Sequence, residues 1–345
     1  MPKLDDASVC LAHCFHVLLS AYCASFFKKM ASMPLIRVAS AGRVHPFGDE
    51  RTVSQAFPSA VSTDEADPFL MCDFFDMPSE GPVSHPDSFP IDWHPHRGMD
   101  ILTYLIGGVG RHGDSMGNRE TFPTPGMQWI SCGSGIEHAE GGATPKGVNM
   151  TGFQIWINVP AAKKMDDPRY GTEPPESIPL EPLGEGARAR LLAGEFQGKV
   201  GRFSTTAPVQ MIDFELEPGA RCTHAIPAGF DTAVLYFYVG GGSVAGTAVE
   251  PQQVALLDAT SDGKRLFELA AGSTAPLRVM LFAGTKLKEP IAWHGPIVMN
   301  TQEQLQDTFM ELRTGRFPPV RAPFDFKRLA DFPDDHVARK GAQGV

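Results

Sequence analysis

The sequence predicts an all-β protein built as two tandem β-barrels with few short helices. Short apolar segments recur along the chain, and each is bounded by Gly, Pro or Asp. The 35 glycines and 30 prolines among the 345 residues are spread along the chain, as many turns between short strands require. A Pro- and Glu-rich segment at 166–187 divides the apolar segments into two groups, which indicates one barrel on each side.

The expected strands of the first barrel are long enough to cross one sheet and are separated by turn residues. They lie at 68–77, 100–110, 126–142 and 150–160. After the crossing, short apolar segments of the same kind resume, among them "MIDFELEPGA", "TAVLYFYVGG" and "PLRVMLFAG". One helix is expected late in the chain, in "NTQEQLQDTFMELRTG": Asn300 or Thr301 caps it, and Gly315 ends it.

These patterns divide the chain into five parts. Residues 1–32 form an extension, 33–165 the N-terminal barrel, 166–187 an interdomain crossing, 188–317 the C-terminal barrel and 318–345 a tail that we expect to be charged and loosely held from Phe324 onward. The stretch 7–27 contains no Asp, Glu, Lys or Arg and is just long enough to span a membrane, but its basic residues follow it. A dispensable extension is the leading interpretation, and a signal anchor or targeting segment stays open.

The charge and cysteine content exclude several classes of protein. The formal net charge is −10 and no dense Lys/Arg block is present, so direct nucleic-acid binding is not expected. The six cysteines form no C-x-x-C pair, which suits a reducing compartment and predicts neither a disulfide scaffold nor a thiolate zinc site. We therefore expect a cytoplasmic or nuclear protein, with organelle or membrane targeting left open by residues 7–27.

Two glycine motifs do not carry function. Gly108, Gly110 and Gly113 match a dinucleotide-binding fingerprint, and Gly113, Ser115 and Gly117 match a nucleophile elbow. Both motifs need a helix directly afterwards. The following "NRETFPTPGM" contains two prolines that exclude such a helix, so these are hairpin glycines.

The histidines give the strongest functional signal. His94 and His96 are two residues apart at one expected strand, and His138 and Glu140 repeat this spacing at another. Alternate residues of a strand share one face, so two adjacent strands would bring three imidazoles and one carboxylate to one point. A buried glutamate is costly unless it is paired or bound to a metal. The sequence therefore predicts a metal site with the ligands His94, His96, His138 and Glu140.

The ligand set narrows the choice of metal. Three nitrogens and one oxygen without a thiolate argue against a structural zinc site. Four ligands on one side of an octahedral ion leave two adjacent positions free, much as in non-haem Fe(II) oxygenases. Fe(II) is the preferred interpretation, and Mn, Ni, Cu or Zn could be held by the same groups.

Several stretches together resemble the pirin family. They are "HPHRG" (94–98), "DSMGNR" (114–119), "QWISCGSGIEHAE" (128–140), "GFQIWINVP" (152–160) and the later segment 289–317. The resemblance implies two cupin barrels face to face, with a metal only in the first, and it places the family's ligands on the same four residues. The sequence departs from the family pattern directly after "HPHRG", where it has Met99, Asp100 and Ile101 in place of the usual Phe-Glu-Thr.

The resemblance implies two functions of different classes. The first is an Fe(II)-dependent dioxygenase of the pirin-like quercetin 2,3-dioxygenase type, in which Glu140 acts as the catalytic base on a small aromatic substrate with an enolic hydroxyl. The second is an iron-containing, redox-responsive co-regulator that binds a transcription factor. A substrate pocket open to the metal would favour the enzyme. For either function we expect a monomer that does not bind a membrane.

Five other residues receive simpler interpretations. We expect Arg97 to form a surface or interdomain ion pair and His112 to be exposed in the hairpin. Trp129 and Trp156 are assigned to the barrel core rather than to a substrate platform. His224 has no second ligand near it in the sequence, so the second barrel is expected to be metal-free.

Overall fold

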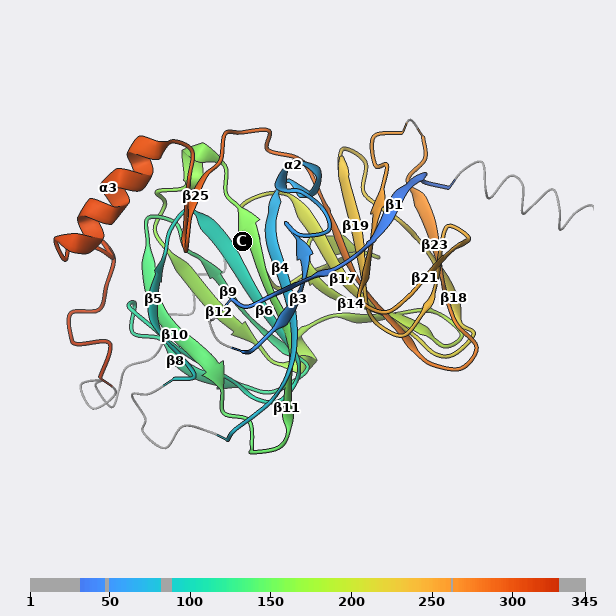
Figure 1. The fold of residues 1–345 in the computed structure, drawn as a ribbon, viewed down its shortest axis with the longest axis horizontal. Coiled ribbons are helices and arrows are strands. Elements are labelled where there is room, and N and C mark those ends of the chain that lie inside the picture. The colour runs from blue at the N-terminus through green and yellow to red at the C-terminus, as the bar shows by residue number, and fades with distance from the viewer. Residues whose placement is uncertain (1–31, 47–49, 82–88, 262, 329–345) are drawn as a thin grey trace, which may run out of the picture.

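The computed structural model describes residues 32–46, 50–81, 89–261 and 263–328 and consists of two strand-rich lobes side by side (Figure 1). In the N-terminal lobe, a seven-stranded and a four-stranded antiparallel sheet form one barrel. The larger sheet has the order β12 (Arg169–Glu173), β9 (Gly126–Ser131), β6 (Met99–Gly107), β11 (Asn149–Asn158), β4 (Phe69–Pro78), β3 (Val53–Phe57), β2 (Gly42–Val44). The smaller sheet has the order β5 (Ile91–His96), β10 (Ile136–Gly142), β7 (Gly110–Asp114), β8 (Arg119–Phe122).

The C-terminal lobe repeats this plan with another seven-stranded and another four-stranded sheet. The larger sheet has the order β1 (Leu35–Ser40), β22 (Gln253–Leu257), β19 (Thr232–Val239), β24 (Leu277–Gly284), β17 (Val209–Leu216), β14 (Ala187–Ala193), β13 (Leu180–Gly184). The smaller sheet has the order β18 (Arg221–Ala225), β23 (Leu266–Ala271), β20 (Gly242–Val244), β21 (Thr247–Val249). The prediction of two all-β barrels is confirmed.

The remaining elements are short. Two-stranded pairs are formed by β15 (Glu195–Phe196) with β16 (Lys199–Val200) and by β25 (Ala292–His294) with β26 (Ile297–Met299). The helices are α2 (Thr63–Ala66), α3 (Gln302–Arg313) and the 3₁₀ turns η1 (Ala161–Lys163) and η2 (Pro175–Ser177). The expected late helix is α3: Thr301 caps it in a capping box with Gln304. No helix in the described part of the chain has the length and apolar character to cross a membrane, and the stretch 7–27 lies outside that part.

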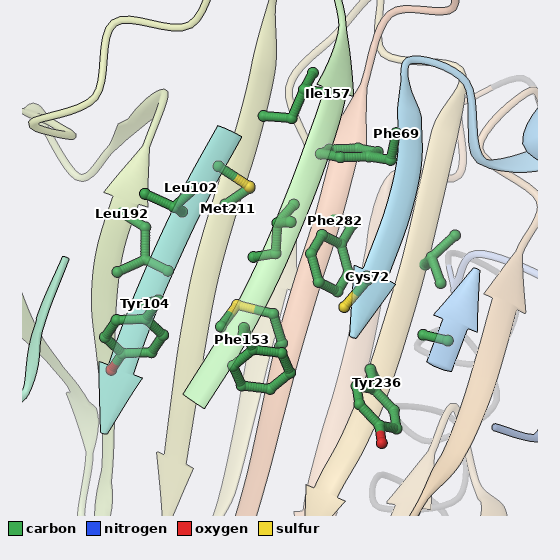
Figure 2. Packing of buried hydrophobic residues seen from close by; sticks show 14 of the residues in the cluster. Phe69, Cys72, Leu102, Tyr104, Phe153, Ile157, Leu192, Met211, Tyr236 and Phe282 are labelled. Atoms are coloured by element: carbon green, nitrogen blue, oxygen red, sulfur yellow. The ribbon is translucent and has the colours of Figure 1, made fainter. Parts of the chain in front are cut away.

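The two large sheets pack face to face and form the central core of the molecule. Phe57 and Phe69 of one sheet contact Phe282 of the other, with ring centroids 5.0 and 5.4 Å from it. Figure 2 shows Phe153 and other residues of this core, contributed by strands of both sheets. Alternate residues of these strands face opposite sides of the sheet, so the residues between the core residues point into the barrel.

A segment near each end of the chain packs in the barrel formed by the other half of the chain. Strand β1 pairs with β22 of the C-terminal sheet. At the other end, Ile297 of β26 bridges to Arg97 of the N-terminal barrel, and Val298 belongs to that barrel's core. This differs from the expected division at 33–165 and 188–317, because pairing between distant segments leaves no local pattern in the sequence. The expected crossing at 166–187 contributes β12 to one barrel and β13 to the other.

The tail is held at least as far as residue 328. The Ala322 amide donates to the Ser115 carbonyl, and the Phe326 ring lies 5.4 Å from Trp93 with only 9% of the residue exposed. The expectation of a loosely held tail from Phe324 is therefore wrong for its first residues. An aromatic side chain packed on the outer face of β5 offsets the cost of ordering this segment.

A buried lysine fixes the returning C-terminal segment to the N-terminal barrel. Lys164 is 1% exposed, and its Nζ donates to the carbonyls of Gly98 and Val298 and to Oδ1 of Asn158, at 2.7, 3.2 and 2.6 Å. All three acceptors are neutral. Burial accordingly lowers the pKa of Lys164 from 10.5 to about 8.

This lysine predicts a rise of stability with pH. Below about pH 8 the folded and unfolded chains both carry the proton, so the cost of burying the charge is present in full. Between pH 8 and 10.5 the unfolded chain binds more protons, and the free energy of unfolding rises by up to about 3 kcal/mol. Urea unfolding across this window should show that Lys164→Met lacks the rise, whereas Lys163→Met, its half-exposed neighbour, keeps it. A rise of equal size in both variants would contradict the assignment.

Candidate metal centre

Strands β5 and β10 bring three predicted ligands together at one edge of the N-terminal barrel. His138 pairs directly with His94 across the two strands, and His96 shares the face of His94 two residues on. Their ligand nitrogens all lie within 4.8 Å of one another. His96 and His138 are buried, and His94 is half-buried. The i, i+2 spacing on two adjacent strands thus produces the cluster that the sequence predicts.

Hydrogen bonds fix the orientation of two of these rings. Nδ1 of His94 donates to the carbonyl of Asp92 at 2.7 Å, so its Nε2 carries the free lone pair. That Nε2 faces Nε2 of His138 at 2.9 Å. Two imidazole nitrogens facing each other at this distance can bind one cation between them. A carbonyl that selects the ring tautomer is the usual support for a metal-binding histidine.

The electrostatics of the cluster suit a metal. Burial, and then the neighbouring imidazoles, hold the pKa values of His96 and His138 well below the usual range, so both rings are neutral. No hydrogen bond of ordinary geometry among the described residues reaches either nitrogen of His96 or Nδ1 of His138. Neutral buried imidazoles with unused nitrogens are the form that binds transition metals, and the donor set therefore fits such an ion.

Glu140, the fourth predicted ligand, lies in the same cavity but outside the histidine cluster. Its Oε1 accepts from Nε2 of Gln154 at 2.9 Å, and its Oε2 accepts from Nε2 of Gln128 at 2.8 Å. Both amides are neutral, so the carboxylate is oriented without an ion pair. Each carboxylate oxygen has a second lone pair, which leaves Glu140 able to bind a metal or accept a proton.

A cavity of about 360 Å³ opens next to these residues. His94, His96 and Glu140 form part of its wall, and most of the remaining wall is apolar. Trp156 also lines it, with its ring centroid 5.2 Å from that of His96. Trp156 packs against the core of this barrel, as predicted, and its ring is also part of the cavity wall. Trp129 stacks on Phe203 against the central core, as predicted.

His112 lies behind His138 and is fully buried, so the prediction that it is exposed is wrong. It belongs to strand β7, whose partner β10 carries His138 and Glu140, and not to the hairpin turn. Its Nε2 donates to Oδ2 of Asp114 at 3.1 Å, and its ring stacks on Tyr170 at 4.2 Å. Asp114 also accepts from the amide nitrogens of Met116 and Asn118, as well as the Asn118 side chain. This network holds the His112 ring in place.

The position of His112 predicts an effect on metal affinity. The His112 and His138 ring centroids are 5.5 Å apart, and Nδ1 of each ring lacks a hydrogen-bond partner among the described residues. Nε2 of His112 donates to Asp114, so Nδ1 of His112 carries no proton and can only accept a hydrogen bond. When Nε2 of His138 binds a metal, Nδ1 of His138 carries the proton. Nδ1 of His112 is then the complementary acceptor for that N–H. We expect His112→Phe, which preserves the stacking ring, to raise the Kd for Ni(II) roughly 10- to 100-fold.

A chelator competition titration checks this result, with thermal unfolding of each metal-free protein measured alongside. The matched control is His224→Phe in the second barrel, where His224 is also buried and contacts Gln210 at 2.8 Å. Equal Ni(II) affinity in the two variants would show that His112 does not support the ligand.

Arg97 connects the ligand strand to the C-terminal helix. It is 2% exposed, and its guanidinium donates to the Ser134 carbonyl, to Oγ1 of Thr308 and to Oε2 of Glu311, at 2.8, 2.8 and 2.5 Å. The predicted ion pair exists and is the interdomain alternative: Arg97 is buried in it, Glu311 of α3 is partly exposed, and α3 covers this end of the barrel. The residue after His96 is thereby fixed by a segment more than 200 positions away.

The two barrels, with a histidine cluster in one of them, define the class of this protein. It is a two-domain cupin protein. The family profiles described as Pirin and as Pirin C-terminal cupin domain match residues 50–157 and 211–318. The chain is 32% identical over 255 residues to human pirin, covering 72% of this chain and 82% of that one. The protein belongs to the pirin family.

Two further relatives are named for an enzyme. A Thermoplasma acidophilum protein, provisionally named a quercetin 2,3-dioxygenase, is 33% identical over 266 residues, covering 71% of this chain and 98% of that one. The crystal structure of a quercetin 2,3-dioxygenase from Acinetobacter baumannii superposes with a TM-score of 0.74 at 26% identity, covering 84% of this chain and 99% of that one.

Proposed function

We propose that this protein is an Fe(II)-dependent dioxygenase that uses O₂ to cleave a small aromatic substrate with an enolic hydroxyl, of the flavonol type. The cavity beside the histidine cluster is the observation that carries the proposal, because a substrate in it would contact His94, His96 and Glu140 directly. The names of the Thermoplasma and Acinetobacter relatives support the same reaction.

Each residue of the site has a role in this reaction. His94, His96 and His138 would hold the metal, with Glu140 as the fourth ligand. The bound metal would supply the activation of O₂ and of the enol oxygen. Glu140 would accept the proton of the enolic hydroxyl, since the amides of Gln128 and Gln154 orient its carboxylate without neutralising it.

The rest of the cavity would orient the substrate and exclude water. Phe75, Leu105, Phe122 and Trp156 offer apolar surface to the faces of an aromatic ligand. Exclusion of water strengthens the electrostatic effect of Glu140 on the bound enol. Both atoms of O₂ would enter the product as the ring opens, so the reaction needs no other oxidant or reductant.

The test is anaerobic purification of the full chain, metal analysis, and measurement of O₂ uptake with quercetin. One iron per chain and O₂ uptake that depends on quercetin are expected. One metal per chain without O₂ uptake across a panel of enolic aromatics would overturn the proposal that the protein is a dioxygenase. That outcome would favour the alternative, a redox-responsive co-regulator acting through contacts with a transcription factor, which needs a metal but no substrate cavity.

A further inference from the structure

A row of polar side chains crosses the larger sheet of the N-terminal barrel. It contains one residue from each of five neighbouring strands: Gln128, Thr103, Gln154, Asp73 and Gln55. They are in register, since Thr103 pairs with Gln128 and Gln154, and Asp73 pairs with Gln154 and Gln55. All except Gln55 line the cavity. This polar row runs along the cavity wall from the side of Glu140 to Asp73 and Gln55.

One end of the polar row is occupied by Glu140. Gln128 and Gln154 each donate to its carboxylate, and Oγ1 of Thr103 donates to Oε1 of Gln154 at 2.6 Å. Thr103 also accepts from Nε2 of Gln128 at 3.3 Å. These groups orient one another and Glu140, and Oε1 of Gln128 is the acceptor among them that keeps no hydrogen-bond partner among the described residues.

The other end of the polar row is open. Nε2 of Gln55 donates to Oδ1 of Asp73 at 2.8 Å, while no hydrogen bond among the described residues reaches Oδ2. Asp73 is 4% exposed and lines the cavity, and its Oδ2 is not among the fully buried atoms that lack a partner, so this oxygen faces the cavity. Burial raises the pKa of Asp73 to about 6, and at neutral pH its carboxyl is mostly ionised. A buried carboxylate oxygen of this kind requires a hydrogen-bond donor.

The surroundings of Asp73 restrict the shape of that donor. On the same strand, the inward positions on either side are Met71, Phe75 and Met77, which all line the cavity. Along its own strand the Asp73 carboxylate is therefore flanked by apolar side chains, while Gln154 and Gln55 lie beside it on the neighbouring strands. A ligand matches this surface when it is apolar over its faces and carries a hydroxyl at the edge remote from the metal.

We propose that Asp73 determines substrate specificity by accepting a hydrogen bond from a second hydroxyl group of the aromatic substrate, at the end remote from its enolic group. The inference rests on the proposed function and narrows its substrate to polyhydroxylated aromatics. A substrate without the second hydroxyl leaves the buried carboxylate unpaired, and sites built this way reject such analogues strongly.

The test compares two flavonols that share the enolic group: quercetin, which has hydroxyls on its outer rings, and 3-hydroxyflavone, which has none. Binding to the metal-loaded full chain is followed by ligand fluorescence or absorbance, and KM and kcat are measured by O₂ uptake. The wild-type protein is expected to bind quercetin about 10- to 100-fold more tightly. Asp73→Asn is expected to lose most of this preference, and Asp73→Leu is expected to reverse it.

The matched control is Asp76→Asn on the same strand. Asp76 is exposed and accepts from Asn149 and Thr151, outside the cavity, so this variant should keep the preference. If wild type, Asp73→Asn and Asp73→Leu show an equal preference for quercetin, the proposed role of Asp73 is overturned, while the proposed function stands. If the wild-type protein binds neither flavonol, the proposed function fails and the role of Asp73 fails with it.

Discussion

Replacing His94 by alanine is expected to weaken metal binding by more than about 100-fold and to leave the fold intact. His94 is one of three clustered imidazoles and is only half-buried, so its loss removes a ligand without opening a cavity in the core. Metal content after dialysis and a chelator titration measure the first effect, and thermal unfolding of the metal-free protein measures the second. His294→Ala is the control, because His294 is exposed and outside the cluster.

Normal metal content in the His94→Ala protein would contradict the assignment of the site. A loss of folded protein together with the metal would instead show that the imidazole stabilises β5. The control separates these outcomes from a general effect of removing a histidine.

Replacing Glu140 by glutamine is expected to lower turnover of a flavonol by roughly 10²- to 10⁴-fold and to weaken metal binding less than His94→Ala does. The amide has nearly the shape of the carboxylate but cannot accept the enolic proton. It also brings an NH₂ group against the amides of Gln128 and Gln154, which now donate to Glu140. O₂ uptake and metal content are measured on the same preparation.

Glu137→Gln is the matched control for Glu140. Glu137 lies on the same strand, and its side chain pairs with Lys327 at 2.9 Å, outside the cavity. Turnover in Glu140→Gln equal to that in Glu137→Gln would remove Glu140 from the mechanism.

The histidine cluster could be predicted because its pattern is local. His94 and His96, and again His138 and Glu140, are two residues apart, and the period of a strand is enough to place each pair on one face. The same rule also applies to His112 and Asp114, which precede a glycine-rich turn. From the sequence we expect His112 in the hairpin, yet β7 extends to Asp114 and lies beside β10. The i, i+2 spacing was therefore the signal that could have identified them.

The polar row was not predicted because each of its residues is a single polar side chain within an apolar strand. Asp73, Thr103, Gln128 and Gln154 stand in four different strands, and only the register of those strands aligns them. An isolated polar residue in a buried segment is itself a signal, because such a group needs a partner. The identity of that partner depends on pairing between strands, which the sequence does not state.

The exchange of chain ends between the barrels has a consequence for synthesis on the ribosome. Strand β1 is synthesised early, but its pairing partner β22 follows more than 200 residues later. During synthesis β1 therefore lacks this partner until β22 has been made. Arg97 likewise has neither Thr308 nor Glu311 until α3 has been translated. A chain that stops before α3 lacks two of the acceptors of this arginine, next to His96. We expect chains that end before α3 to unfold more readily, because they lack these contacts and the packing of α3 against the barrel.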